Sequence, residues 1–144
     1  MDTEPPWTFN GVEFTDDDIN GAAGFCYLIV HNETGRKYLG RKYFESKRKA
    51  NKKAKRRTTT ESDWKTYWGS SKTFSAEVET HGKSEYSRII LSIHKTRGDC
   101  NMTEVKEQFA RNVLEDDSYA NENISGKWRR TPKHIVEARR IAKN

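Results

Sequence analysis

Apolar and polar residues alternate along several stretches of the chain, which is the pattern of strands that bury one face in a sheet. Residues 7–14 alternate on either side of an Asn-Gly dipeptide, which favours a two-residue hairpin turn. Residues 24–30 form a mostly apolar run rich in strand-forming residues, and residues 36–42 alternate after a turn. We therefore predict a central antiparallel pair from these two segments, with a third strand over residues 86–94.

Other stretches have the spacing or the end signals of helices. Residues 15–18 resemble a short helix start, and residues 72–80 have a helical pattern that stops at Gly82. Thr131-Pro132 has the residues of an N-cap and a first helical position, which predicts a last basic helix up to residue 143.

A further helix is predicted over residues 103–114, where apolar side chains recur at about 100° per residue. Its predicted apolar face consists of Met102, Val105, Phe109 and Val113. The predicted fold class is therefore α/β (α+β), a small three-stranded antiparallel sheet flanked by helices.

The composition points in two directions. Only 24 of the 144 residues are Leu, Ile, Val or Phe, and 33% are charged, a balance typical of disordered chains. However, 11% of the residues are aromatic, which favours one folded domain with a modest core. The longest apolar run is much shorter than the roughly 20 residues of a membrane span, and the acidic N-terminus is unlike a signal peptide. With only two cysteines, we expect a cytoplasmic setting (that of the host cell, if a phage encodes the chain) and no membrane partner.

The net charge of +6 is concentrated in two segments. Residues 41–57 hold ten bases against one acid, and a second basic cluster closes the chain from residue 127. Such clusters indicate a polyanion, and we predict double-stranded DNA as the partner rather than an acidic membrane surface. The predicted DNA-binding residues are Arg41, Lys42, Lys52, Lys53, Arg56, Arg57, Lys127, Arg129, Arg130, Arg139 and Arg140.

The central strand pair carries two tyrosines, within Cys26-Tyr27 and Tyr38-Leu39-Gly40. Tyrosines on a hairpin are common in cores, but these short sequences resemble the two motifs of the GIY-YIG nuclease family, which lie on such a hairpin. Three downstream residues fit the order found in that family. They are Arg48, ten residues after the second tyrosine, Glu107 ahead of a phenylalanine, and Asn123 ahead of an isoleucine.

The resemblance implies a DNA endonuclease that depends on a divalent ion, Mg²⁺ or Mn²⁺, and on no small-molecule cofactor. Glu107 would hold the ion, since Mg²⁺ keeps most of its waters and needs few protein ligands. Tyr27 would act as the general base or orient the water, and Tyr38 would position the phosphate or the water. Arg48 would neutralise charge in the transition state, and Asn123 would hydrogen-bond the phosphate.

The chain is predicted to divide into three parts. Residues 1–23 form an acidic hairpin and short helix, residues 24–126 the nuclease-like domain, and residues 127–144 a basic tail that resembles the DNA-binding modules appended to homing endonucleases. Within the second part, residues 46–60 have almost no apolar side chains, so a mobile basic loop or a helix that orders on DNA is expected. A monomer with one site would most simply nick, and a monomer is the favoured state.

Several alternatives stay open at this point. Arg41, Lys42 or Arg57 could take the role of Arg48, and the basic loop could serve solubility alone. The whole protein could be a non-catalytic nucleic-acid-binding protein that uses its basic surface. An unrelated nuclease site built on Glu104 and Lys106 is a third reading.

Overall fold

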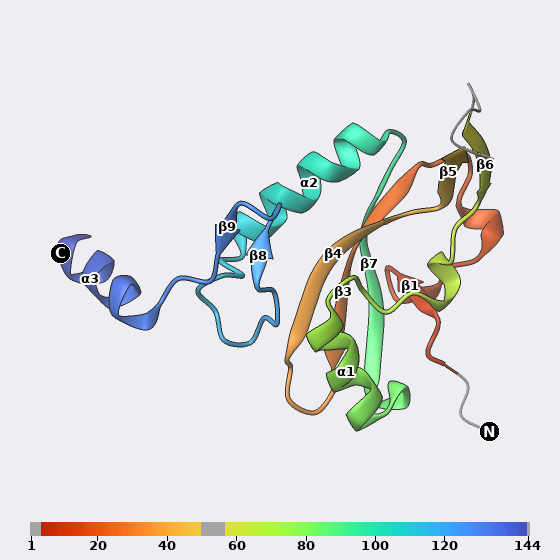
Figure 1. The fold of residues 1–144 in the computed structure, drawn as a ribbon. Helices are drawn as coiled ribbons and strands as arrows, with labels where there is room; N and C mark the ends of the chain where they lie inside the picture. Colours follow the sequence, from red (N-terminus) through yellow and green to blue (C-terminus); the bar gives the residue numbers. More distant parts are fainter. Residues whose placement is uncertain (1–3, 50–56, 144) are drawn as a thin grey trace.

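The computed structural model describes residues 4–49 and 57–143, and its centre is a five-stranded sheet with the order β2-β1-β7-β3-β4 (Figure 1). The strands are β1 (Trp7–Phe9), β2 (Val12–Glu13), β3 (Gly24–His31), β4 (Lys37–Tyr43) and β7 (Tyr86–His94). Strand β3 pairs antiparallel with both β4 and β7. The three predicted strands are confirmed, and the sheet is larger because the N-terminal hairpin joins it.

The N-terminal hairpin β1–β2 adds to the sheet through a parallel pairing of β1 with β7. Asn10 and Gly11 at its turn both have positive φ, 53° and 81°, as a two-residue primed turn requires. Trp7 at the start of β1 is buried, and its Nε1 donates a hydrogen bond of 2.6 Å to the Trp64 carbonyl. The hairpin is therefore part of the same hydrogen-bonded layer as the central strands, although the predicted division at residue 23 stays a prediction.

The expectation of a loop or a helix over residues 46–60 is wrong for its described part. Strand β5 (Glu45–Lys49) pairs antiparallel with β6 (Arg57–Glu61) in a separate two-stranded ladder. The three threonines at residues 58–60 are β-branched and favour an extended backbone. Since neither strand alternates with apolar residues, the period-2 signal that identified the central strands is missing here.

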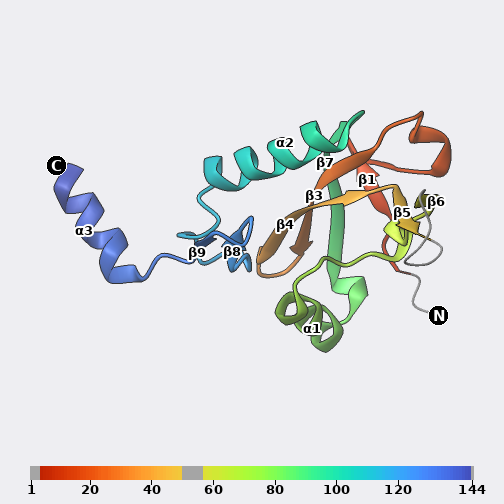
Figure 2. The ribbon, with the colours of Figure 1, turned by 45° about the horizontal axis from the view of Figure 1, so that its top comes forward.

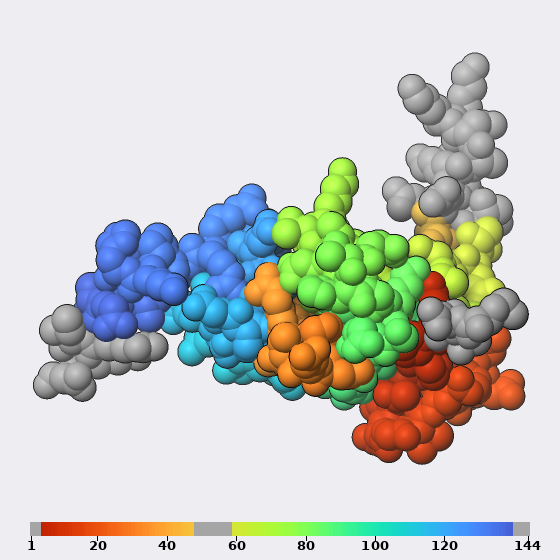
Figure 3. Space-filling model, turned by 90° about the horizontal axis from the view of Figure 1, so that it is seen from below, coloured from red at the N-terminus to blue at the C-terminus, as the bar shows by residue number. Residues whose placement is uncertain are grey.

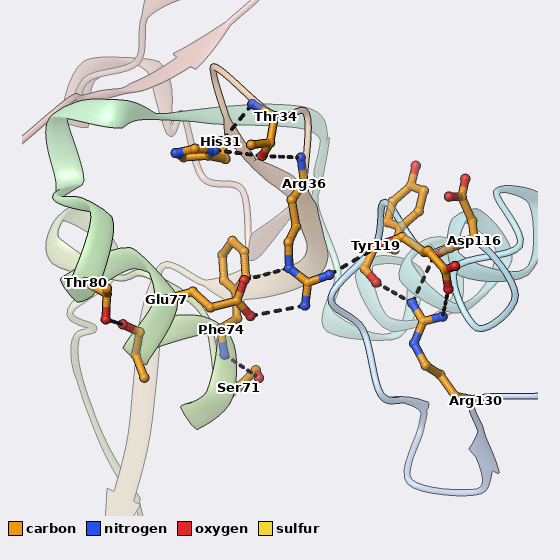
Figure 4. Close-up of polar contacts among 12 residues, drawn as sticks. His31, Thr34, Arg36, Ser71, Phe74, Glu77, Thr80, Asp116, Tyr119 and Arg130 are labelled. Atoms are coloured by element: carbon orange, nitrogen blue, oxygen red, sulfur yellow. Dashed lines mark hydrogen bonds and ion pairs between the residues drawn. The ribbon is translucent and has the colours of Figure 1, made fainter.

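Helix α1 (Lys72–His81) confirms its prediction. The Ser71 side chain accepts a hydrogen bond of 3.2 Å from the Phe74 amide, and the helix ends at Gly82 with a φ of 94°. Figure 4 shows this cap, together with the bidentate pair of Arg36 and Glu77. That pair connects the turn between β3 and β4 to α1.

Helix α2 (Arg97–Ala110) begins six residues before the predicted start and ends four residues before the predicted end. The Thr96 side chain caps it by accepting from the Asp99 amide at 3.1 Å. The predicted apolar face is wrong in part, because Val105 and Val113 pack into the core but Met102 and Phe109 are exposed, and Cys100 and Gln108 are buried instead. The side of α2 that faces the sheet follows Cys100, Glu104 and Gln108, each four residues apart. Two of these three residues are polar, so hydrophobicity alone misplaces the buried face.

The chain continues past α2 into a short antiparallel pair, β8 (Asn123–Ile124) and β9 (Trp128–Arg129), and then into helix α3 (Lys133–Lys143). The pairing of β8 with β9 crosses the boundary predicted at residue 126. Helix α3 begins two residues after the predicted N-cap and projects from the rest of the molecule (Figures 1 and 2). Among the described residues, none of the helices has the length and apolar character needed to cross a bilayer.

Helices α1 and α2 lie on opposite sides of the sheet (Figure 2), and the core is split between the two faces. One face packs against α1 and residues 64–68 and is mainly aromatic, with Trp7, Phe25, Tyr27, Phe44, Trp64, Trp68 and Phe74 all buried. The other face packs against α2 and the segment after it, around Leu39, Val113, Tyr119 and Ile124. In Figure 3 the α1 region (green) lies between the C-terminal segments (blue) and the N-terminal hairpin (red).

Candidate active site

The two tyrosines of the central hairpin lie on the same face of the sheet, with ring centroids 6.4 Å apart. Tyr27 on β3 is opposite Gly40 on β4 in the strand register. A Cβ atom at Gly40 would collide with the hydroxyl end of the Tyr27 ring. The glycine in the second motif is therefore needed because the ring crosses directly over its backbone.

Tyr27 is buried, with only 1% of its surface exposed. Its ring packs edge-on against the rings of Tyr67 and Trp7, with centroid distances of 6.0 Å and 5.1 Å. Burial raises the pKa of the Tyr27 phenol well above its ordinary value, and the neighbouring Tyr67 and Tyr38 add to this. At neutral pH the phenol is uncharged, so it can donate a hydrogen bond but is a poor base.

Tyr38, in contrast, reaches a cavity of about 370 Å³ at the edge of the sheet. Its hydroxyl lies 3.1 Å from Ser70 Oγ, and its ring stacks on Phe74 at 5.4 Å. Burial raises the pKa of Tyr38 as well, while the hydrogen bond with Ser70 acts in the opposite direction. The other residues around the cavity are Ser70, Ser71, Lys72, Thr73, Glu104, Gln108, Glu122, Asn123 and Ser125.

Glu104 enters this cavity from α2, on the opposite side of the sheet from Tyr38. Its side chain is only 20% exposed, and burial raises the pKa of the carboxyl, with Arg41 opposing the shift. Arg41 Nε lies 3.3 Å from Glu104 Oε1 but has no hydrogen-bond partner. The carboxylate is thus largely removed from water without a full partner, which makes it a favourable ligand for a cation.

Both sides of the sheet contribute to one cavity because β4 is its edge strand. The outer edge of β4 is covered by side chains rather than by another long strand. Asn121 Oδ1 accepts from the Leu39 amide at 3.0 Å, while Asn121 Nδ2 and Gln108 Nε2 donate to the Leu39 carbonyl. These amides hold α2 and the segment before β8 against the edge. Nothing in the sequence pattern pointed to Asn121 or Gln108 as positioning residues.

The structure brings together some of the predicted site residues and separates others. Tyr38 and Asn123 line the cavity, and Tyr27 lies behind Tyr38 without lining it, with the two ring centroids 6.4 Å apart. Glu107 is absent from the residues around the cavity, and its Oε2 accepts at 2.9 Å from Nε of Arg111, the residue directly after α2. Asn123 Oδ1 accepts from the Gly126 amide at 2.9 Å, which orders the turn after β8.

Arg48 lies on strand β5, not on a helix as the resemblance implied. The side chains of Arg48, Arg57 and Arg140 fall outside the described part of the chain, and so do residues Lys52, Lys53 and Arg56 altogether. Their predicted roles stay predictions.

A second cleft, of about 350 Å³, lies along the end of β4 and is rich in cations. Arg41, Lys42, Lys47 and Arg97 all line it, against the single acid Glu45. Arg97 was not singled out in the sequence, because it precedes the predicted helix. Its Nη2 donates to the Glu45 carbonyl at 2.7 Å, and its guanidinium lies 4.1 Å from the Tyr43 ring centroid. The cleft offers phosphate groups several charged donors beside Tyr67.

The predicted DNA-binding residues of the tail differ in their surroundings. Lys127 and Arg129 are exposed, whereas Arg139 forms an ion pair with Glu115. The Arg130 side chain points back at the protein and donates to the carbonyls of Val113, Asp116 and Tyr119 (Figure 4). Arg130 therefore anchors β9 to the loop after α2, and its predicted contact with DNA stays a prediction.

The donor set of the cavity fits one hard divalent ion. Glu104 and Glu122 supply carboxylates, and Asn123 and Gln108 supply amide oxygens. Within the described residues, no three His, Cys, Asp or Glu side chains gather into a ready set of ligands. Mg²⁺ tolerates such a sparse site because it keeps several waters.

Comparison with known proteins gives one match. Residues 7–124 match a family model described as "Putative endonuclease segE, GIY-YIG domain". No curated protein and no solved structure gives a match. The matched range begins at β1 and ends at β8. It therefore contains the five-stranded sheet and all the residues that line the cavity of Tyr38 and Glu104 except Ser125.

Proposed function

Because the chain belongs to the GIY-YIG endonuclease family, we propose that it hydrolyses phosphodiester bonds in double-stranded DNA with the help of one divalent ion, Mg²⁺ or Mn²⁺. The observation that carries this proposal is the meeting of Tyr38, Glu104 and Asn123 in one cavity at the edge strand β4. Phosphodiester hydrolysis needs a positioned water, neutralised phosphate charge and a stabilised leaving oxygen.

Glu104, rather than Glu107, is proposed to hold the ion. The Glu104 carboxylate is buried in the cavity and only partly compensated by Arg41, whereas Glu107 already pairs with Arg111 outside it. When bound, the ion would supply positive charge against the phosphate and lower the pKa of a bound water. Asn123 and Gln108 would orient the groups around that carboxylate.

The two tyrosines are proposed to have different tasks. The Tyr38 hydroxyl borders the cavity, so it would contact the scissile phosphate or the attacking water. Tyr27 is buried behind it and uncharged at neutral pH, so it would position Tyr38 and donate a hydrogen bond rather than remove a proton. Arg41 is proposed to neutralise the phosphate, in place of Arg48, because its Nε has no hydrogen-bond partner and lies 3.3 Å from Glu104 Oε1.

A monomer with one such cavity would cut one strand at a time. We therefore propose that a single binding event produces a nick. The exposed bases Lys127 and Arg129 after the family domain support a homing-type or free-standing enzyme that binds DNA through its tail. For a basic surface of this kind, the logarithm of the DNA-binding constant falls linearly with the logarithm of the salt concentration.

The test is conversion of supercoiled plasmid to nicked circles with Mg²⁺ or Mn²⁺. Glu104→Gln is expected to lose activity by about 10²-fold or more, the usual cost of removing a group that stabilises the transition state. Glu107→Gln is the matched control on the same helix and is expected to cut at nearly the wild-type rate.

Equal cutting by wild type and Glu104→Gln would contradict the proposed site. Loss of activity in Glu107→Gln alone would restore the assignment made from the sequence. Salt-sensitive binding by wild type with no product in either metal would favour the non-catalytic alternative.

A further inference from the structure

An exposed aromatic pair lies beside the candidate active site. Phe109 on α2 is 47% exposed and Trp128 on β9 is 48% exposed, yet their rings meet edge-on with centroids 5.2 Å apart. Together they border a groove of about 470 Å³ between the end of α2, the loop after it, the β8–β9 hairpin and Arg139 of α3. The aromatic residues of the core are buried, so a pair of half-exposed rings on neighbouring elements is unusual in this molecule. Exposed apolar groups of this kind indicate a binding surface.

The hairpin that presents Trp128 is firmly held. Ser125 and Gly126 take left-handed φ values of 55° and 68° at its turn, and Asn123 Oδ1 bonds the Gly126 amide. Ile124, the register partner of Trp128, is buried in the core. Arg130 fixes the far end of β9 to carbonyls of the loop after α2 (Figure 4). The ring therefore needs little ordering when a ligand binds.

The edges of the groove are positively charged. Lys127, Arg129 and Arg139 line it together with the single acid Glu115, which already pairs with Arg139. The Lys127 ammonium lies 6.0 Å from the centroid of the Trp128 ring. Aromatic faces next to cations are the arrangement that proteins use for unpaired nucleobases and their phosphates.

The groove and the catalytic cavity are neighbours. Gln108 lines both of them. On β8, Asn123 lines the cavity and the next residue, Ile124, lines the groove. In the register of the hairpin, Asn123 pairs with Arg129. A strand whose phosphate lies against Tyr38 and Glu104 would pass its next nucleotides towards this groove.

We propose that the Phe109–Trp128 groove binds a nucleobase unstacked from the DNA strand that is held at the catalytic cavity. This inference rests on the proposed function and adds a local distortion of DNA to it. Stacking on Trp128 repays the cost of unstacking, and Lys127 and Arg129 hold the flanking phosphates. A protein partner would gain less from this groove, because its charged edges would need matching acids, whereas every nucleotide carries a negative phosphate.

Tryptophan fluorescence tests the proposal directly. Trp7, Trp64 and Trp68 are buried, so Trp128 is the exposed tryptophan of this chain. A short thymidine oligonucleotide, or a duplex with a single-base bulge, is titrated into the protein in EDTA so that no strand is cut. Stacking predicts saturable quenching of the tryptophan emission by the oligonucleotide, and the quenching is expected to disappear in Trp128→Phe.

Affinity is measured separately, by the anisotropy of the same oligonucleotide carrying a dye. Trp128→Phe keeps a ring and is expected to bind within about threefold of wild type, whereas Trp128→Ala is expected to bind about 5- to 150-fold more weakly. Met102→Ala removes another exposed apolar side chain from α2 outside the groove and is the matched control. Unchanged unfolding midpoints in both Trp128 variants exclude a loss of folding as the cause.

Three results would overturn the proposal. They are an unquenched wild-type emission under saturating oligonucleotide, equal affinity of Trp128→Ala and wild type, and a dimer that dissociates in Trp128→Ala without any change in DNA affinity. The last result would assign the groove to a second copy of the chain.

Failure of the proposed nuclease function has a different signature. In that case Glu104→Gln and wild type behave alike in the plasmid assay, while the quenching by oligonucleotide still reports on the groove. If the wild type is quenched by the oligonucleotide but Trp128→Ala nicks plasmid at the normal rate, base binding is separate from catalysis. That result would contradict the link between groove and cavity.

Discussion

The two faces of the central sheet are built from different chemistry. The face towards α1 buries a cluster of aromatic rings with one charged group, Arg88, at its centre. The face towards α2 buries Cys26, Leu39 and Gln108 and keeps the Glu104 carboxylate mostly out of water, so that polar side chains occupy positions that a core usually fills with apolar ones. The aromatic face contains the larger buried cluster and carries the two tyrosines, whereas the polar face carries the Glu104 carboxylate. The candidate site lies at β4, where the two faces meet at an edge.

The largest expected effect comes from the charge within the aromatic face. Arg88 is buried, its guanidinium lies between Trp7 and Trp68, and it donates to the carbonyls of Pro5, Lys65 and Tyr67. Burial lowers the pKa of Arg88 to about 10, so the side chain is still charged at neutral pH. Arg88→Met leaves three carbonyls without donors and is expected to lower the free energy of unfolding by about 3 kcal/mol or more.

Chemical denaturation measures this loss. Arg129→Ala, which removes an exposed arginine from β9, is the control and is expected to change stability by less than about 0.5 kcal/mol. If Arg88→Met were as stable as Arg129→Ala, the contrast between a structural face and a catalytic face would fail at its strongest point.

The next effect tests how tightly the tyrosine pair is fixed. Gly40→Ala places a methyl group against the Tyr27 hydroxyl, and overpacking of this kind costs about 1–3 kcal/mol. Gly98→Ala on α2 has open space around it and is expected instead to stabilise the helix by roughly 0.5–1 kcal/mol. Thermal unfolding of the two variants compares them, and a stable Gly40→Ala protein that still nicks DNA would show that the Tyr27 ring can move aside.

The smallest effect concerns the buried carboxylate of the polar face. The pKa of Glu104 is raised by burial, so as the pH rises past the ordinary value of 4.5 the unfolded chain ionises first and the native state loses stability. Glu104→Gln removes this penalty. In metal-free buffer at pH 7 its Tm is expected to be about 2–4 °C above wild type, a shift that corresponds to roughly 1 kcal/mol in a chain of this size.

The size of this effect should change with pH and with added metal. The advantage of Glu104→Gln is expected to shrink as the pH falls below 4.5, where the carboxyl becomes protonated in both states, and added Mg²⁺ should raise the Tm of wild type but not of the variant. Glu107→Gln loses only an exposed pair with Arg111, so its Tm should follow wild type within about 1–2 °C. A Mg²⁺ response lost in Glu107→Gln and kept in Glu104→Gln would reverse the assignment of the metal ligand.

The sequence predicted the parts of the fold that depend on local periodicity. The alternation in residues 24–30, 36–42 and 86–94 placed the three central strands, and the Asn-Gly dipeptide placed the N-terminal turn. It failed for β5 and β6, which lack apolar alternation, and for the start of α2, which is set by the Thr96 cap and not by apolar periodicity. The attachment of β1 to β7 could not be predicted, because a parallel contact between residues about 80 apart leaves no local pattern.

The candidate site divides in the same way. The sequence by itself determined the tyrosine hairpin, because the side chains of a strand alternate between its faces and only a glycine fits beneath the Tyr27 ring. It did not determine which glutamate faces the site, because Glu104 and Glu107 share one helix and the rotation of that helix is set by what it packs against. Tertiary structure decided this. The amides of Gln108 and Asn121 bind the Leu39 backbone at the sheet edge, which turns a polar stripe of α2 inwards and leaves the apolar Phe109 beside Trp128 at the surface.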